Sequence, residues 1–121
     1  MGRVEEFTQE GEKFIYIDFS GITTDNDFMK AVKEAGSVIE AYPEKSVYTI
    51  TNISNVKFDT HTKEIAGDYL EHNRPYVKMG IVVGLDGIKK MMVRTVMKLG
   101  GRSNLDYAFT KAQAVELLLR K

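Results

Sequence analysis

Cysteine is absent from this 121-residue sequence, so disulfide bonds and thiol chemistry are excluded and a reducing compartment is permitted. Long apolar runs are missing as well. The longest nearly apolar run, at residues 79–85, is far shorter than the roughly 20 residues that span a bilayer. The N-terminus shows neither a signal peptide nor a myristoylation pattern. We therefore expect a cytoplasmic protein without a transmembrane segment.

An excess of charge of either sign is also missing. The 17 basic residues balance 17 acidic ones, which argues against general nucleic-acid binding driven by net charge. A chain of 121 residues suffices for one domain whose hydrophobic core needs no disulfide or metal support. We expect a single domain over residues 1–121.

Runs of β-branched and aromatic residues, bounded by turn-forming residues, predict five strands. The first two flank the sequence QEGEK, whose Gly11 suits a tight turn, and should form a hairpin. In the second strand, Ile15 and Ile17 alternate with Phe14 and Tyr16, so both of its faces should be covered. The expected strands are residues 3–8, 14–20, 46–53, 77–84 and 105–109.

Four helices are predicted by apolar residues at helical spacing. Thr24 and Thr110 precede the first and the last of them as capping residues. The first helix should reach Tyr42, because Pro43 stops it. The expected helices are residues 24–42, 60–73, 86–99 and 110–118. The side chains that the last helix should bury are those of Ala114, Leu117 and Leu118.

The resulting order is β-β-α-β-α-β-α-β-α. After the hairpin the strands alternate with helices, so they should be parallel with right-handed crossovers, giving a mixed sheet in an α/β fold. This order, with NISNVKFD leading into a helix, resembles the STAS domain, the family of sulfate-transporter domains and anti-sigma-factor antagonists. The segments KMGIVVGLDGIKKMMVRTVMKLGGR and LDYAFTKAQAVELLL are similar to its SpoIIAA-like, STAS/lipid-transfer-like branch of small bacterial proteins.

The resemblance implies a site at the start of the second predicted helix. In the antagonists, an Asp-Ser pair there carries a regulatory phosphate, and the surrounding surface binds a kinase-like anti-sigma factor. The matching residues here are Asp59 and Thr60, followed by His61 and Thr62. A phosphate on Thr60 would be favoured by the unpaired N–H groups and the positive dipole end of a helix N-terminus.

The same residues allow other interpretations. Asp59 and Thr60 are good N-caps, and a junction from strand to helix needs a cap whether or not anything binds there. His61 with Asp59 and Thr60 or Thr62 contains the residue types of a nucleophilic triad, but near neighbours in sequence rarely supply its geometry. Two histidines without cysteine or an HExxH spacing argue against a metal site, and we expect no cofactor.

A second candidate surface, for an anion or a partner, follows the fourth predicted strand. The sequence GLDG lies between a strand and a helix, where phosphate-binding loops occur, but it lacks the glycine and lysine spacing of the nucleotide motifs. A tight turn that caps the next helix is the favoured interpretation. That helix combines basic residues with methionines, which suits an acidic partner or a membrane surface, or else a solvated helix with methionines in the core. The residues of this surface are Gly84, Asp86, Gly87, Lys89, Lys90 and Arg94.

The predicted function is a non-catalytic regulatory or protein-interaction module, similar to the anti-sigma-factor antagonists. It would use residues 55–63 and 84–87, because both follow the C-terminal ends of parallel strands, where open α/β sheets bind ligands. The alternative is a binder or carrier of a small apolar or lipid-like ligand, as the lipid-transfer side of the resemblance implies. Such a ligand needs a cavity between helices and sheet, lined by side chains such as Phe28, Tyr69 and Met92. An uncharacterised enzyme is the third hypothesis.

Overall fold

A computed structural model describes residues 3–57, 59–84 and 105–120. The third predicted helix, with Asp86, Gly87, Lys89, Lys90 and Arg94, lies outside these residues, and the helix numbering passes from α2 to α4. The elements are β1 (Val4–Gln9), β2 (Glu12–Asp18), α1 (Asp25–Glu40), β3 (Val47–Asn52), α2 (Thr60–Asn73), β4 (Val77–Val83), β5 (Leu105–Tyr107) and α4 (Lys111–Leu119).

The described strands form one five-stranded sheet in the order β1-β2-β3-β4-β5. Strands β1 and β2 pair antiparallel, and each later pair is parallel, which confirms the mixed sheet expected from the sequence. Glu10 and Gly11 both have positive φ, 50° and 79°, as a two-residue hairpin turn requires. The tight turn lets the backbone ladder continue to the pair Gln9 and Glu12. Strand β2 therefore begins two residues before the predicted Phe14.

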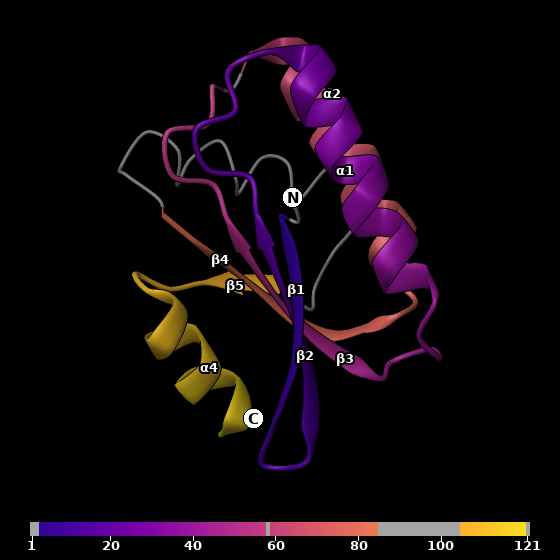
Figure 1. Cartoon of the computed structure of the whole chain (residues 1–121), viewed down its shortest axis with the longest axis vertical. Coiled ribbons are helices and arrows are strands. Elements are labelled where there is room, and N and C mark those ends of the chain that lie inside the picture. Colours follow the sequence, from indigo (N-terminus) through magenta and orange to yellow (C-terminus); the bar gives the residue numbers. More distant parts are fainter. Residues whose placement is uncertain (1–2, 58, 85–104, 121) are drawn as a thin grey trace.

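The two faces of the sheet are covered by different helices. Helices α1 and α2 pack side by side on one face, and α4 packs on the other (Figure 1). The predicted alternation along β2 is confirmed, because Ile15 and Ile17 belong to the core under α1 and α2, whereas Phe14 belongs to the core under α4. Strand β2 is therefore covered on both faces.

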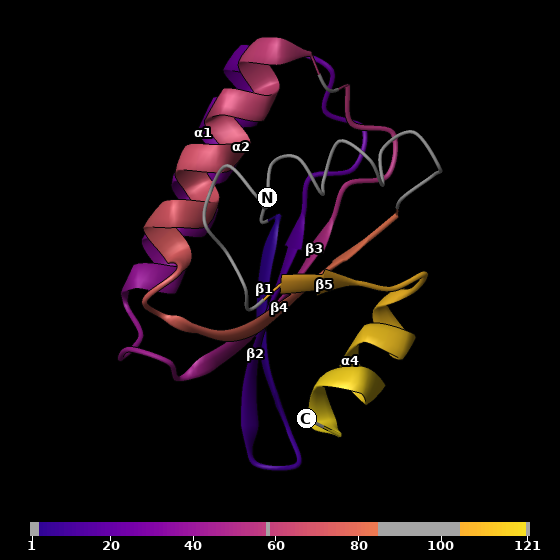
Figure 2. The same cartoon turned by 180° about the vertical axis from the view of Figure 1, so that it is seen from behind.

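Helices α1 and α2 run in the same direction, because each one connects two parallel neighbouring strands across the same face (Figures 1 and 2). Their first residues consequently lie at one edge of the sheet. Helix α1 ends at Glu40, earlier than predicted, with Ala41 as its C-cap. Tyr42 lies beyond that end but still packs on the same core, which explains why it fits the helical spacing.

Aromatic side chains fill the layer between these two helices and the sheet. Phe19 is 2% exposed, and its ring meets Phe28 of α1 at 5.3 Å and Tyr69 of α2 at 5.7 Å, both edge-on between centroids. Phe28 and Tyr69 therefore both pack on Phe19 in this layer. Met92, the third side chain considered for a ligand cavity, lies outside the described residues.

The opposite layer needs one correction. In α4, Ala114 and Leu118 are buried as predicted, but the third buried residue is Val115, and Leu117 is only partly buried. With nine residues, α4 has one narrow contact face, and Val115 follows Ala114 directly on the side that meets the sheet. Spacing alone does not distinguish Val115 from Leu117, since both lie within one turn of the other two.

Candidate functional site

The candidate site lies where strands β2 and β3 end and helices α1 and α2 begin. Asp59 has an extended backbone and is the N-cap of α2. Its Oδ1 accepts hydrogen bonds from the Thr62 backbone N–H at 2.8 Å and from the Thr62 hydroxyl at 2.9 Å. These bonds, the N–H first, favour the ionised carboxylate and lower the pKa of Asp59. The cap that the sequence requires at this junction is therefore formed by Asp59.

A second carboxylate reaches the same hydroxyl from the neighbouring helix. Asp25 is the first residue of α1, and its Oδ1 lies 3.0 Å from Thr62 Oγ1. Thr62 is 2% exposed, so its hydroxyl is enclosed between the side chains of Asp25 and Asp59. A hydroxyl carries one proton and donates it to one of the two carboxylates at a time.

His61 contacts α1 through the same aspartate. Its Nδ1 lies 2.8 Å from Asp25 Oδ2, and with the carboxylate ionised the ring N–H is the donor. This hydrogen bond, followed by the negative charge of Asp25, raises the pKa of His61. Asp25 thus joins two consecutive residues of α2, His61 and Thr62, to the start of α1.

Asp25 is the residue that the sequence analysis missed. A signal for it exists in the topology, because two parallel crossovers on one face of a sheet bring the starts of both helices to the same edge. An acidic first residue of α1 is then within reach of the first turn of α2. Local patterns at a single helix start reveal the cap of α2 but not its partner on α1.

The four predicted residues at this junction take different roles. Asp59 and Thr62 hold the first turn of α2 in place. Thr60 is exposed as the first residue of the helix, and His61 is exposed while paired with Asp25. Within the described part of the chain, no hydroxyl is hydrogen-bonded to the second ring nitrogen of His61. Other molecules can therefore contact this junction at the outer surface formed by Thr60 and His61.

Raising the pH should weaken the contact between His61 and Asp25. The pKa of His61 in the folded protein lies above its ordinary value of 6.5, so the pair stabilises the fold fully below that value. The stabilisation is lost as the pH rises through the folded pKa. Glu64 and Asp59, the other charged groups near the ring, raise the pKa in the same direction. An NMR titration of His61 should have its midpoint above 6.5.

Asp25→Asn is the matched variant, because the amide oxygen can still accept the Thr62 hydroxyl while the charge is removed. In this variant the His61 midpoint should move down towards its ordinary value. Urea unfolding at about pH 6 and about pH 8 should show a larger loss of stability for the wild type than for Asp25→Asn. If the midpoint of the His61 titration is the same in both proteins, the contact between His61 and Asp25 is contradicted.

Gly84 is the described member of the second predicted surface. It follows β4 with φ 84°, and a Cβ placed on it would lie 2.2 Å from Ser54 Oγ and 2.7 Å from Ser54 N. The chain leaving β4 therefore passes directly against the beginning of the loop that leads to Asp59. The structure thus brings Gly84 next to the first candidate surface, whereas the other members lie outside the described residues.

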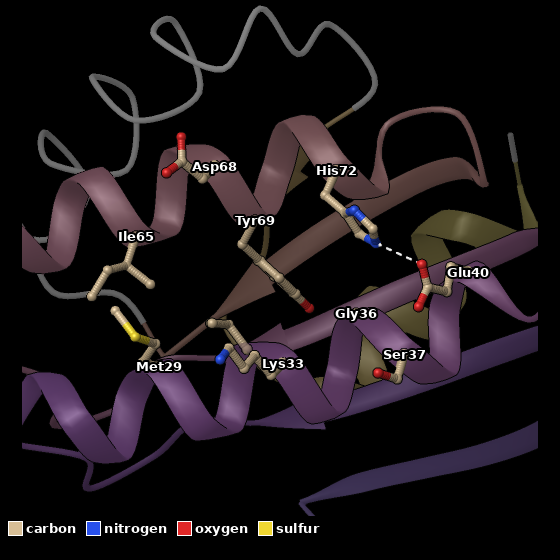
Figure 3. A pocket seen from close by; sticks show the side chains of 10 residues that line it. Met29, Lys33, Gly36, Ser37, Glu40, Ile65, Asp68, Tyr69 and His72 are labelled. Carbon is tan, nitrogen blue, oxygen red and sulfur yellow. Dashed lines mark ion pairs between the residues drawn. The ribbon is translucent and has the colours of Figure 1, made fainter.

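An open groove separates the outer sides of α1 and α2 (Figure 3). Its volume is about 500 Å³, and its walls include Met29 and Val32 from α1 and Ile65 and Tyr69 from α2. At the C-terminal end of the helices, His72 Nε2 lies 3.3 Å from Glu40 Oε2 (Figure 3). The residues of this groove do not surround a closed cavity between helices and sheet, which is where the sequence analysis considered a ligand.

Two further properties concern the described residues alone. In residues 3–57, 59–84 and 105–120, no three side chains of the metal-binding types come together as ligands of one ion. Among the helices of that same part of the chain, none has both the length and the apolar character needed to cross a bilayer.

Comparison with known proteins identifies the class of fold. No family model matches the sequence, and no curated protein matches it. Among solved structures, an uncharacterised protein from the DUF3478 family of Shewanella loihica PV-4, with a SpoIIAA-like fold, is similar with a TM-score of 0.69. The match covers 95% of this chain and 91% of that chain, at 9% sequence identity. This protein has a SpoIIAA-like α/β fold.

Proposed function

We propose that this STAS-like module is a non-catalytic, cytoplasmic regulatory protein that acts by binding a protein partner at the start of α2. The observation that carries the proposal is that some residues at this junction hold the helix start in place while another is exposed. Asp59, Thr62 and Asp25 hold the first turn rigidly through hydrogen bonds of 2.8 to 3.0 Å. Thr60 stands exposed on that turn, at the position matching the regulatory serine of the antagonists.

The exposed Thr60 hydroxyl is also the place at which a phosphate would regulate the module. As the first residue of α2, Thr60 lies where unpaired backbone N–H groups and the helix dipole favour an anion. The first turn keeps its cap without Thr60, because Asp59 provides it. A phosphate can therefore be added without removing a hydrogen bond that the helix needs.

Thr60→Arg should reduce the amount of partner captured from the protein's own cells by about fivefold or more, because a long cation replaces a small side chain in the interface. The captured protein is identified and quantified by mass spectrometry, and the same spectra locate any phosphate on Thr60. Thr60→Ser should retain the partner, since it keeps the hydroxyl on a similar side chain.

Thr8→Arg provides the matched control. Thr8 is also exposed, but it lies in β1, the edge strand of the sheet, and not on α2. Equal capture by Thr60→Arg and Thr8→Arg would overturn the proposed surface. If the protein turns over a substrate and this activity is lost in Thr60→Ser or Asp25→Asn, the result would instead support an enzyme.

A second candidate function, a carrier of a small apolar ligand, is favoured by the groove between α1 and α2. Its volume of about 500 Å³ lies in the range of small-molecule sites, and four apolar side chains contribute to its walls. The test is a comparison of the native and the denatured mass of protein purified from its own cells. A mass that falls on denaturation supports a carrier, and an unchanged mass contradicts it.

A further inference from the structure

The groove between α1 and α2 has an apolar floor that reaches the surface. Val32 and Ile65 lie in it from opposite helices, and Met29 at its margin is 38% exposed. Gly36 lines the groove in the middle of α1, and a Cβ there would lie in ordinary contact with the ring of His72, at 3.5 Å.

The exposed side of α2 next to the groove, called here the α2 rim, carries a row of carboxylates, of which Asp68 lines the groove itself. Glu64, Asp68 and Glu71 are exposed and follow one another along α2 at spacings of four and three residues, which places them on one side of the helix. Figure 3 shows Asp68 directed away from α1 at the edge of the groove. None of the three forms an ion pair with a described residue. The α2 rim is therefore an acidic surface whose three carboxylates form no ion pair within the described part of the chain.

The opposite rim differs in charge. On α1, Lys33 and Ser37 border the groove, and neither adds a carboxylate there (Figure 3). Glu40, farther along α1, is paired with His72 across the groove. Along the middle of the groove, a bound molecule thus meets Asp68 on the α2 side and Lys33 and Ser37 on the α1 side, with the Glu40–His72 pair at one end.

We propose that the groove docks an amphipathic helix of a partner protein, with apolar side chains on the floor and lysines or arginines against Glu64, Asp68 and Glu71. Two parallel helices with an apolar channel between them offer the surface into which a third helix packs. The unequal rims determine which flank of the partner helix is basic, and so they set its orientation. This inference rests on the proposed function, because it names the chemistry of the partner.

Thr60 extends the acidic rim towards the start of α2. It precedes Glu64 by four residues, so Thr60, Glu64 and Asp68 lie on the same side of the helix. A phosphate on Thr60 adds negative charge to this row and strengthens the attraction of a basic helix. The regulatory residue and the groove then belong to one continuous binding surface.

The test uses purified full-length protein and a fluorescent synthetic peptide of about 18 residues, an amphipathic helix of leucine, alanine and lysine with lysines along one flank. Fluorescence anisotropy should show saturable binding by the wild type. The double variant Glu64→Gln with Asp68→Asn should bind the peptide about tenfold more weakly, because two carboxylates of the rim are removed. Met29→Gln should weaken binding as well, since it makes the margin of the groove polar.

The matched control is Glu34→Gln with Glu44→Gln, which removes two exposed carboxylates that neither line the groove nor belong to α2. This variant should bind the peptide like the wild type. Equal weakening by both double variants would overturn the proposal, because it would show only general attraction between charges. Equal binding of a scrambled peptide that has the same composition but no apolar face would overturn it too.

The outcome is independent of the capture experiment on Thr60. Binding of the peptide in the groove, together with a partner that is insensitive to Thr60→Arg, supports the groove and contradicts the proposed function. Loss of the partner in Thr60→Arg, together with no peptide binding, supports the proposed function and overturns the groove. Release of a small ligand that fills the groove of purified protein, without peptide binding, also overturns the helix proposal.

Discussion

Replacing Phe19 by alanine should lower the free energy of unfolding by about 3–5 kcal/mol, because the truncation leaves a cavity where three elements meet. The ring contacts Phe28 of α1 and Tyr69 of α2 and is itself 2% exposed. Domains of this size have a total stability of about 5–15 kcal/mol, so one substitution removes a large part of it. Urea unfolding followed by circular dichroism measures the change.

Phe19→Leu is the control for the same position. Leucine keeps most of the apolar volume, and the expected loss is below about 1.5 kcal/mol. The difference between the two variants reports the cavity rather than the loss of the aromatic ring. Similar stability of the alanine and the leucine variant would mean that Phe19 does not join α1 and α2 to the sheet.

Gly84→Ala should destabilise the protein by about 2–5 kcal/mol, since a steric clash is added to an unfavourable backbone conformation. The added Cβ would lie 2.2 Å from Ser54 Oγ, which can rotate, but also 2.7 Å from the backbone nitrogen of Ser54, which cannot. The same nitrogen donates to Asn52 Oδ1 at 2.9 Å, so the loop has little room to shift. Thermal and urea unfolding both measure the loss.

Gly21→Ala separates the two causes. Gly21 has a similar φ of 76°, but a Cβ there would meet nothing within 4 Å. Its expected cost is about 1–2 kcal/mol, from the backbone conformation alone. If both alanine variants lose the same stability, the close approach between Gly84 and the loop after β3 does not restrict the chain.

The two histidines of the sequence have related positions in the fold. Both lie on α2 and face a carboxylate on α1, His61 with Asp25 at one end of the helix pair and His72 with Glu40 at the other. The histidines thus contribute to the unit formed by α1 and α2, whose outer side carries the proposed docking groove.

Much of the fold could be predicted because local patterns and tertiary contacts agree. The alternation at Ile15 and Ile17 predicted a strand covered on both faces, and α1 and α2 cover one face while α4 covers the other. The residues predicted for the second helix match α2 (Thr60–Asn73), since its start has a cap and its end lies close to Pro75. The bounds of β2 were less accurate, because polar residues near a tight turn pair through their backbone, which leaves no pattern in their side chains.

The candidate site could be predicted only in part. Asp59 was recognisable because a helix that follows a strand needs an N-cap, and aspartate is among the best residues for it. The role of Thr62 could be seen only in the structure. Its hydroxyl lies within hydrogen-bond distance of two carboxylates that are 3 and 37 residues away in sequence. No local pattern connects Asp25 with Thr62.

The sequence by itself determined the order of the described strands and helices along the chain, the parallel sheet after the hairpin and the cap of α2, because these follow from periodicity, turn chemistry and chain connectivity. Only the tertiary structure decided that Asp25 meets His61 and Thr62, that Gly84 touches Ser54, and that an apolar groove lies beside the acidic rim of α2. The physical reason is distance along the chain. Contacts between residues of different elements depend on how helices pack on a twisted sheet, and periodicity within one element carries no information about its neighbour.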